Sequence, residues 1–246
     1  MLVGTCCCVM QHPSLFSIGL YFVRRKLRGR GLGLRLWKAM SQRLGNSNAS
    51  LNCFAKDLGL YRNRLGFPLV QPWAMLVYVS SALSPEKLPE PSNELRVVPV
   101  DRTLLPQVIA YDTLVHCYDR TKAVTLTVRD PHGLTRAVVQ RQSGQDVVCG
   151  FGRIGRCTLG GAIVGPIYAE HPDFAGVLLR ALVEGYPLAR DRLCMKVLSC
   201  NPGGSRLAQT LGFVDCTELL RCYRKQKVHV RFEEIYAVHD NSFCTF

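Results

Sequence analysis

The sequence predicts a mixed α/β (α+β) fold in two lobes, each with a mixed β-sheet flanked by helices, and three observations support this. Apolar runs typical of strands alternate along the chain with stretches of helical spacing. A segment from Ser80 to Glu94 places Pro85, Pro89 and Pro91 among Ser and Glu, so neither a helix nor a central strand is expected there. The motifs before and after this segment also repeat in the same order.

Length and composition are compatible with this organisation. The chain has 246 residues, of which 48% are hydrophobic, enough to bury a core, and this excludes disordered and collagen-like proteins. We assign residues 1–80 to a first lobe, 81–94 to a linker, 95–230 to a second lobe and 231–246 to a C-terminal tail.

In the first lobe, two apolar runs separated by the polar, Pro-containing segment Gln11–Ser14 predict a β-hairpin. A helix is expected where Leu32, Leu36, Met40 and Leu44 recur at every fourth residue. In order, we expect strands at Leu2–Met10 and Leu15–Val23, a basic Gly-rich loop at Arg24–Gly31, the helix from Leu32, a strand near Leu51–Ala55, a helical turn through Asp57–Leu65 and a strand near Ala74–Val79.

The second lobe shows the same alternation of apolar runs and helical spacing. We expect strands at Leu95–Val100, Arg136–Arg141, Val147–Ile154, Ala162–Tyr168, Leu193–Ser199 and Glu218–Arg224, and helices at Leu104–Tyr118, Asp173–Gly185 and Ser205–Leu211.

Two pairs of segments indicate an internal duplication. Tyr61–Phe67 and Leu207–Phe213 both end in Leu-Gly-Phe and both lie between apolar strands, and Ile18–Val23 resembles Ile163–Tyr168 ahead of a loop and a helix. Less chain precedes the glycine loop of the first copy than precedes the matching point of the second. We therefore infer a duplicated unit whose first copy lacks its beginning.

Positive charge is concentrated in the first third of the chain. Residues 1–80 hold 11 Lys and Arg against a single acid, Asp57, so an anionic partner is expected there. A solvated basic patch that meets nucleic acid or a nuclear import factor is an alternative.

The cysteines and histidines give no metal motif. The chain holds 12 cysteines without a C-x-x-C pair and 6 histidines without ligand spacing, so we expect reduced, buried thiols in a cytoplasmic protein, with the nucleus as an alternative location. A redox or metal role for the thiols is the less favoured interpretation. No signal peptide or membrane anchor is expected, because Arg24–Lys26 follow the first apolar stretch and polar residues interrupt it.

The segment Arg28-Gly29-Arg30-Gly31-Leu32-Gly33 lies directly between a predicted strand and a predicted helix. Glycines allow a ligand to approach the backbone closely, and the first turn of a helix presents unpaired N–H groups with partial positive charge. Arg24, Arg25 and Lys26 add to that field. This arrangement predicts a site for a pyrophosphate.

Two better-known phosphate loops fit this segment poorly. A P-loop needs Lys-Ser or Lys-Thr after its glycines, which is absent. A dinucleotide fingerprint needs glycine at position 34, where the chain has Leu34, and an acid about 20 residues further on, where only Asp57 comes close.

Arg28, Gly31 and Gly33 instead form R-x-x-G-x-G, which resembles the acetyl-CoA loop of the GNAT superfamily of N-acetyltransferases. The strand residues Ile18–Val23 before the loop, and Tyr61-x-x-x-Leu-Gly-Phe67 after it, resemble the strand and the terminal helix of that fold. Gly150–Ile154, Val164–Ala169 and Asn201 ahead of Leu211-Gly-Phe213 are similar to the C-terminal domain of two-lobed GNAT proteins of the YitH/HolE type. The first lobe lacks the opening strand and helices of the family, so it resembles an N-terminally truncated lobe.

The resemblance implies acetyl-CoA as co-substrate and no metal. Backbone amides of Arg28, Gly29, Arg30, Gly31, Leu32 and Gly33 would hold the CoA pyrophosphate, and the backbone of Tyr21 and Val23 would contact the pantetheine arm. Tyr61 would be the general acid that protonates the CoA thiolate as an amine attacks the thioester directly. A surface role for the Tyr61 phenol is the alternative, and Trp37 is expected in the core.

The second lobe departs from the cofactor pattern. Its corresponding loop is Ala169–Ala175, in which Glu170 and Asp173 would repel a diphosphate, and Leu207 replaces the tyrosine. We expect a degenerate lobe that serves as scaffold or substrate wall.

These features predict an acetyl-CoA-dependent N-acetyltransferase, with a catalytically silent GNAT-fold binding module as the alternative. The missing segment would impair turnover. The general base is open, since Asp57 and His12 are the obvious ionisable candidates in the first lobe. The expected partners are acetyl-CoA and an amine acceptor of unknown identity; no membrane partner is expected, nucleic acid is disfavoured, and the oligomeric state is open.

Overall fold

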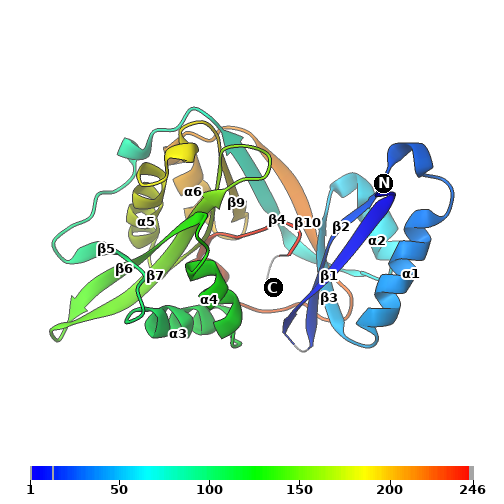
Figure 1. Cartoon of the computed structure of the whole chain (residues 1–246), viewed down its shortest axis with the longest axis horizontal. Helices are drawn as coiled ribbons and strands as arrows, with labels where there is room; N and C mark the ends of the chain where they lie inside the picture. The colour runs from blue at the N-terminus through cyan, green and yellow to red at the C-terminus, as the bar shows by residue number, and fades with distance from the viewer. Residues whose placement is uncertain (1, 13, 244–246) are drawn as a thin grey trace. The chain divides into compact units, whose positions relative to one another are not determined.

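The computed structural model of the chain describes residues 2–12 and 14–243 and confirms the mixed α/β class (Figure 1). The chain forms two compact units, each discontinuous in sequence. The first unit comprises the described residues up to Pro72, then Leu219–Val228 and the described residues from Asp240 on. The second unit comprises Trp73–Glu218 and His229–His239. The boundaries expected from the sequence treat each lobe as one continuous segment and do not anticipate this exchange.

The strands of the first unit follow the order β1-β2-β3-β10. β1 (Gly4–His12) pairs antiparallel with β2 (Leu15–Val23), and β2 pairs in parallel with β3 (Asn48–Cys53). β10 (Cys216–Tyr223) pairs antiparallel with β3. A parallel pair needs a crossover connection, and the chain between β2 and β3 supplies it as a helix.

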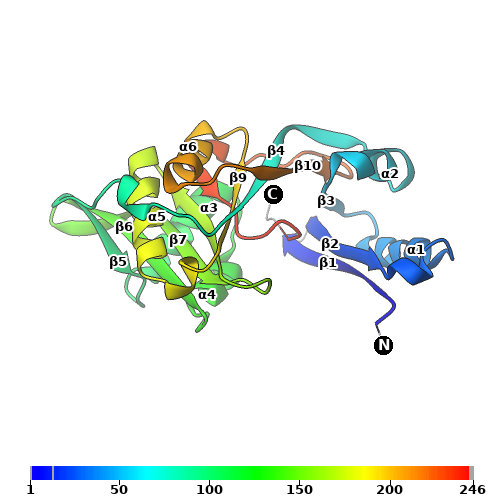
Figure 2. The ribbon, with the colours of Figure 1, turned by 90° about the horizontal axis from the view of Figure 1, so that it is seen from above.

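That helix is α1 (Leu32–Leu44), which starts after Gly31 and stops at Gly45, two glycines with positive φ. A second, shorter helix is α2 (Leu58–Arg64). Both helices lie on the same side of the strands (Figures 1 and 2). The apolar side of α1 therefore faces the strands, in line with the amphipathic spacing of its sequence.

Aromatic side chains fill the core of the first unit. Trp37 of α1 is 6% exposed, and its ring centroid lies 5.8 Å from that of Phe67. Tyr21 and Tyr61 pack on the same indole, at 5.2 and 5.9 Å between ring centroids. The prediction that Trp37 belongs to the core is confirmed.

The strands of the second unit follow the order β4-β9-β8-β7-β6-β5, and β11 pairs with β8 off this path. Its strands are β4 (Leu69–Ser80), β5 (Leu95–Pro99), β6 (Gly133–Gln142), β7 (Gln145–Arg156), β8 (Ala162–Ala169), β9 (Leu193–Leu198) and β11 (Ile235–Ala237). Its helices are α3 (Leu105–His116), α4 (Thr121–Val128), α5 (Pro172–Glu184) and α6 (Pro202–Leu211). α5 with α6 and α3 with α4 cover opposite faces of the sheet (Figure 1).

The exchange of segments follows from strand pairing. β4 comes after α2 in the chain but pairs antiparallel with β9 of the second unit, from Met75↔Leu198 to Ser80↔Leu193. β10 comes after α6 but pairs with β3 of the first unit, from Leu220↔Cys53 to Tyr223↔Ser50. The strand that follows each Leu-Gly-Phe motif therefore completes the sheet of the other unit.

The structure also corrects the sequence prediction in three places. α4 was not predicted, because a helix of eight residues is too short to show a clear helical period. The expected linker contains η3 (Pro85–Lys87) and packs on the second unit through Leu88, which is 2% exposed. The expected C-terminal tail contains η5 (Phe232–Glu234) and the buried strand β11, and its residues 244–246 lie outside the described residues. A three-residue strand leaves no periodic signal in a sequence.

The paired Leu-Gly-Phe motifs give a stability prediction. Phe213 is 2% exposed and packs on Tyr78, with 5.6 Å between ring centroids, whereas the next residue, Val214, is 86% exposed. Phe213→Ala should lower the free energy of unfolding by about 3–5 kcal/mol through cavity formation, and Val214→Ala by less than about 0.5 kcal/mol. Denaturant titration of both variants measures the difference, and equal midpoints would contradict the assigned core.

Candidate functional site

The Gly-rich loop between β2 and α1 leaves the start of α1 open. Gly29 and Gly31 have φ of 77° and 75°, a left-handed conformation that favours glycine, and a Cβ on either would meet no atom within 4 Å. Gly31 is the N-cap and supplies no side-chain hydrogen bond. In the described part of the chain no side chain caps the first turn of α1, so its N–H groups are available to a ligand.

A cleft of about 560 Å³ lies in front of this helix start. It is lined by residues of β2, the loop, the first turn of α1 and the segment that follows β3: Tyr21, Phe22, Val23, Leu27, Arg28, Gly29, Gly31, Leu32, Gly33, Leu34, Phe54, Lys56, Asp57, Leu60 and Tyr61. We call it the loop cleft. All of its lining residues belong to the first unit.

β2 and β3 separate next to the loop cleft. Their parallel pairing runs from Leu15↔Asn48 only to Ile18↔Leu51. Beyond it β2 bulges, since Leu20 and Tyr21 together stand opposite the single residue Cys6 of β1, and Leu20 has a φ of 52°. The separation opens a space between the two strands at their carboxyl ends.

The backbone of Val23 is already partly used. The Nε of Arg28 donates a hydrogen bond to the Val23 carbonyl at 3.0 Å. Arg28 thereby ties the loop back onto the end of β2, and its guanidinium lies 5.9 Å from the centre of the Phe22 ring. The backbone contact that we expected between Val23 and the pantetheine arm has to use its N–H group or displace Arg28.

Gly33 packs closely on its neighbour on β2. A Cβ at this position would stand 2.8 Å from the Tyr21 hydroxyl oxygen, so that side chain would have to shift to admit one. The third glycine of the loop therefore lets the first turn of α1 approach β2, rather than providing a special backbone conformation.

Tyr61, the residue predicted to lie near the reacting thioester, lines the loop cleft from α2. Its phenol is half-buried against Trp37. Burial raises the pKa of Tyr61 well above its ordinary value, and nearby Cys53 and Asp57 raise it further. Burial also raises the pKa of Tyr21. Both phenols are therefore protonated at neutral pH.

A smaller cavity adjoins the loop cleft. It has a volume of about 260 Å³ and shares Tyr21, Phe54, Asp57 and Tyr61 with the loop cleft. Its other lining residues are Ile18, Gly19, Leu20, Leu51, Asn52, Cys53, Leu219, Asn241 and Ser242. We call it the far cavity. Tyr61 and Asp57 thus stand where two spaces in the first unit meet.

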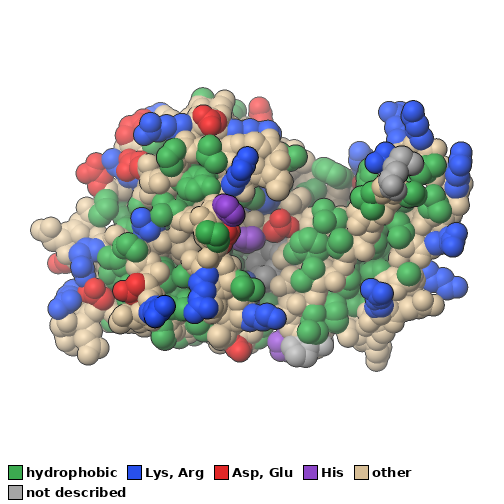
Figure 3. Space-filling view, in the orientation of Figure 1, with side chains coloured by type: hydrophobic (Ala, Val, Ile, Leu, Met, Phe, Trp, Pro, Cys, Tyr) green, Lys and Arg blue, Asp and Glu red, His purple; other side chains and the backbone are tan. Residues whose placement is uncertain are grey.

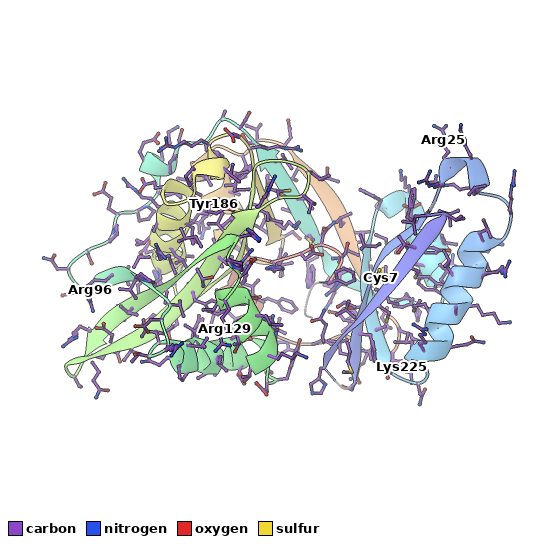
Figure 4. The ribbon with its side chains drawn as sticks, in the orientation of Figure 1. Cys7, Arg25, Arg96, Arg129, Tyr186 and Lys225 are labelled. Carbon is purple, nitrogen blue, oxygen red and sulfur yellow. The ribbon has the colours of Figure 1, made fainter. Side chains whose placement is uncertain are left out.

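The predicted site residues gather in one place, with one exception. Tyr21, Val23, Arg28, Gly29, Gly31, Leu32, Gly33 and Tyr61 all line the loop cleft, whereas Arg30 does not. Arg24, Arg25, Lys26 and Arg30 are exposed; Figure 4 shows Arg25 pointing outward, and Figure 3 shows Lys and Arg side chains gathered along this part of the first unit. These side chains contribute long-range positive potential rather than contacts within the cleft.

Sequence reasoning missed Phe54, Lys56 and Leu60, which line the loop cleft as well. They follow β3, whose carboxyl end lies beside that of its parallel neighbour β2. Ligands of open α/β sheets bind at the carboxyl ends of strands, so the pairing of β2 with β3 is the signal that would have found them. Of the two candidate bases, Asp57 lines the cleft, whereas His12 bonds to the Ser14 hydroxyl at 2.9 Å at the end of β1.

The second unit has no comparable opening at the matching place. β8 and β9 pair in parallel only from Ala162↔Leu193 to Val164↔Met195. The gap that follows is filled by β11, which pairs with β8 at Ile235↔Tyr168, and by Val238, whose N–H donates to the Lys196 carbonyl of β9 at 2.9 Å.

The start of α5 is equally unsuited to a phosphate. Pro172 at its first position has no N–H, and the His171 ring accepts the N–H of Asp173 at 3.5 Å. Burial and the carboxylate of Glu234 raise the pKa of the adjacent Glu170. The start of α5 therefore offers fewer open N–H groups than the start of α1.

Comparison with known families places both parts of the chain in one group. Residues 108–237 match the profile described as "Acetyltransferase (GNAT) domain", and residues 2–67 match the one described as "Acetyltransferase (GNAT) family". The chain therefore belongs to the GNAT acetyltransferase family, and acyl transfer is the activity that this family indicates. No curated protein sequence matches the chain.

Several solved structures are similar in fold. A Pyrococcus horikoshii protein described as an acetyltransferase gives a TM-score of 0.69 at 17% identity, over 98% of this chain and 76% of its own. A tandem GNAT protein from the clavulanic acid biosynthesis pathway gives 0.63 at 13% identity, over 85% and 74%. A GCN5-related N-acetyltransferase from Sphaerobacter thermophilus gives 0.61 at 16% identity, over 89% and 75%. At these identities the likeness concerns the fold.

No group of three or more His, Cys, Asp or Glu side chains is arranged to hold a metal ion within residues 2–12 and 14–243. In the same part of the chain, no helix combines the length and the apolar content that a membrane crossing requires.

The environment of Tyr61 predicts its titration. At about pH 10.5, slightly above the ordinary tyrosine pKa of about 10, Tyr61 should still be protonated, so Tyr61→Phe should leave the tyrosinate absorbance unchanged. In denaturant, where burial is lost, a tyrosine of ordinary pKa is about three quarters ionised at this pH, so the two proteins should differ by about 0.75 of one tyrosinate. The same difference in the folded proteins would show that Tyr61 is solvated.

Proposed function

We propose that the chain is an acetyl-CoA-dependent N-acetyltransferase whose catalytic site is the loop cleft of the first unit. The observation that carries the proposal is the meeting of two features in one cleft: the open N–H groups at the start of α1 and the buried phenol of Tyr61. An acyl-CoA needs both features, since its diphosphate and its thioester lie at opposite ends of an extended molecule.

The loop cleft suits the charge of the co-substrate. Arg28 and Lys56 line it, and the first turn of α1 adds partial positive charge. The diphosphate would accept hydrogen bonds from the backbone N–H groups of Gly29, Gly31, Leu32 and Gly33. The pantetheine arm would then extend along Tyr21 and Phe22 of β2 toward Tyr61. No metal is needed for this mode of binding.

Tyr61 supports a direct transfer. The nitrogen of a neutral amine forms a bond to the thioester carbonyl carbon, the C–S bond breaks, and its electron pair leaves on the CoA sulfur. The protonated Tyr61 hydroxyl donates its proton to that thiolate, and the phenolate regains a proton from the acylated nitrogen. The raised pKa of Tyr61 keeps the donor form populated at neutral pH. No enzyme nucleophile is used, so the cysteines have no catalytic role.

The loop assignment predicts the effect of a bulky acid at Gly31. Gly31→Glu should abolish acetyl-CoA binding by steric block and charge repulsion, while costing the fold only about 1–2 kcal/mol for the left-handed backbone. Heat stability with and without acetyl-CoA measures this, because a ligand that binds only the folded protein raises the melting temperature.

A matched control exists at Gly144, which has a φ of 82° and equally open surroundings in the second unit. Gly144→Glu should carry the same strain and retain the full acetyl-CoA shift. If acetyl-CoA still raised the melting temperature of Gly31→Glu by the full amount, the loop would not be part of the binding site.

The role of Tyr61 predicts a selective loss of rate. Tyr61→Phe should lower kcat by about 10²–10⁴-fold, the range of general acid catalysis, and leave acetyl-CoA binding unchanged. CoA release should be measured by chromatography, because exposed cysteines such as Cys117, Cys200 and Cys216 would react with a thiol reagent.

The same assay tests the function itself. If the unaltered chain binds acetyl-CoA but releases no CoA above background with any primary amine, it is a silent binding module and not an enzyme. If it is active and Tyr61→Phe is equally active, the general acid is another group.

A further inference from the structure

The segment Asp240–Phe243 lies against the separated ends of β2 and β3 in the first unit. The Asn52 side-chain amide of β3 donates to the Asn241 carbonyl at 2.7 Å, and Gln11 of β1 donates to the Phe243 carbonyl at 3.2 Å. Asp240 accepts the N–H groups of Ser242 and Phe243 at 2.6 and 2.9 Å. We call this segment the strap.

The strap forms one wall of the far cavity. Asn241 and Ser242 both line it. Ser242 approaches β2 so closely that a Cβ on Gly19 would stand 2.5 Å from the Ser242 Cβ and 2.9 Å from its carbonyl oxygen. Only glycine at position 19 allows this packing, so the position of the strap is built into β2.

In the second unit, the stretch of chain just before the strap lies at the corresponding opening between the parallel strands. Ile235–Val238 enters the gap between β8 and β9 and closes it with backbone hydrogen bonds, and Gly165 of β8 admits the Val238 carbonyl. In the first unit the strap covers the opening without filling it, and about 260 Å³ remains. Two consecutive stretches of the chain therefore have different effects. Ile235–Val238 closes the opening in the second unit, whereas the strap forms the wall of a cavity in the first.

The far cavity has an acidic group in its wall. Among the described residues that line it, Asp57 alone has a charged side chain, and it stands beside Tyr61 at the junction with the loop cleft. The polar groups elsewhere are the neutral side chains of Asn52, Asn241 and Ser242. The loop cleft, in contrast, presents Arg28 and Lys56. The buried Arg221 guanidinium lies behind Asn52, to whose Oδ1 it donates at 3.4 Å, and does not line the cavity. The carboxylate of Asp57 at the cavity surface therefore favours a cation.

We propose that the strap and Asp57 restrict the acceptor to small primary amines that arrive as ammonium ions, and that the strap excludes peptide chains. This inference rests on the proposed acetyl transfer. Asp57 attracts and orients the ammonium group, which loses one proton to water before its nitrogen attacks the thioester. At about 30 Å³ per water-sized group, the cavity holds an acceptor of about eight non-hydrogen atoms. A polypeptide crossing it would collide with Asn241 and Ser242.

Two strap variants test the size limit in opposite directions. Asp240→Ala removes the two hydrogen bonds that shape the strap and should raise kcat/KM for a lysine-containing octapeptide relative to ethanolamine by about tenfold, the effect of about one hydrogen bond. Ser242→Trp should fill the cavity and lower kcat/KM for ethanolamine by at least about tenfold. Neither change should alter the KM for acetyl-CoA, because the strap does not line the loop cleft.

Asp101→Ala is the matched control, since Asp101 accepts the N–H groups of Thr103 and Leu104 at 2.9 Å in the same kind of turn in the second unit. It should leave the substrate ratio unchanged. Asp57→Asn tests the role of the charge. It should raise the KM for benzylamine, which is a cation at neutral pH, and leave unchanged the KM for aniline, which is uncharged at that pH.

The outcomes separate the two proposals. If the unaltered chain binds acetyl-CoA but acetylates none of these amines, the proposed function fails and this inference fails with it. If the chain is active but prefers the octapeptide, or if both folded strap variants keep the original substrate ratio, only the inference is overturned. The inference is supported if the unaltered chain prefers ethanolamine to the octapeptide, if this preference is weaker in Asp240→Ala, and if activity on ethanolamine falls in Ser242→Trp.

Discussion

The early end of the pairing between β2 and β3 is the constraint on which the candidate site depends. Parallel strands stay in register as long as their backbones exchange hydrogen bonds, and here that exchange ends at Ile18 and Leu51. A bulge at Leu20 and Tyr21 turns β2 away at that point. The start of α1 and the residues that follow β3 are left around a common opening, with Tyr61 between its two sides.

The two units show how the same supersecondary plan gives different surfaces. Both contain a parallel strand pair that stops early, and both have a helix after the first strand of that pair. In the first unit glycines leave the helix start bare. In the second, Pro172 and His171 occupy the helix start and β11 occupies the gap between the strands. The difference arises from a few residues at the helix start and from one added strand.

Local patterns predicted much of this arrangement. The bounds of β2 and the span of α1 follow from apolar spacing and flanking glycines, and most of the residues chosen for the loop line one cleft. Features set by distant parts of the chain escaped prediction. Lys56 and Phe54 enter the site because β3 lies beside β2, and β11, Asn241 and Ser242 reach their places through pairings with strands far away in sequence. No periodicity within a short segment encodes such contacts.

The binding of a diphosphate by the first turn of α1 is the central claim, and amide NMR tests it most directly. CoA should shift the backbone N–H signals of Gly31, Leu32 and Gly33 strongly, because hydrogen bonds to an anion change these groups first. Pantetheine, which carries the same arm without the diphosphate, should leave these three signals in place and shift only those near Tyr21 and Tyr61. Unmoved amides at the start of α1 in the presence of bound CoA would contradict the account.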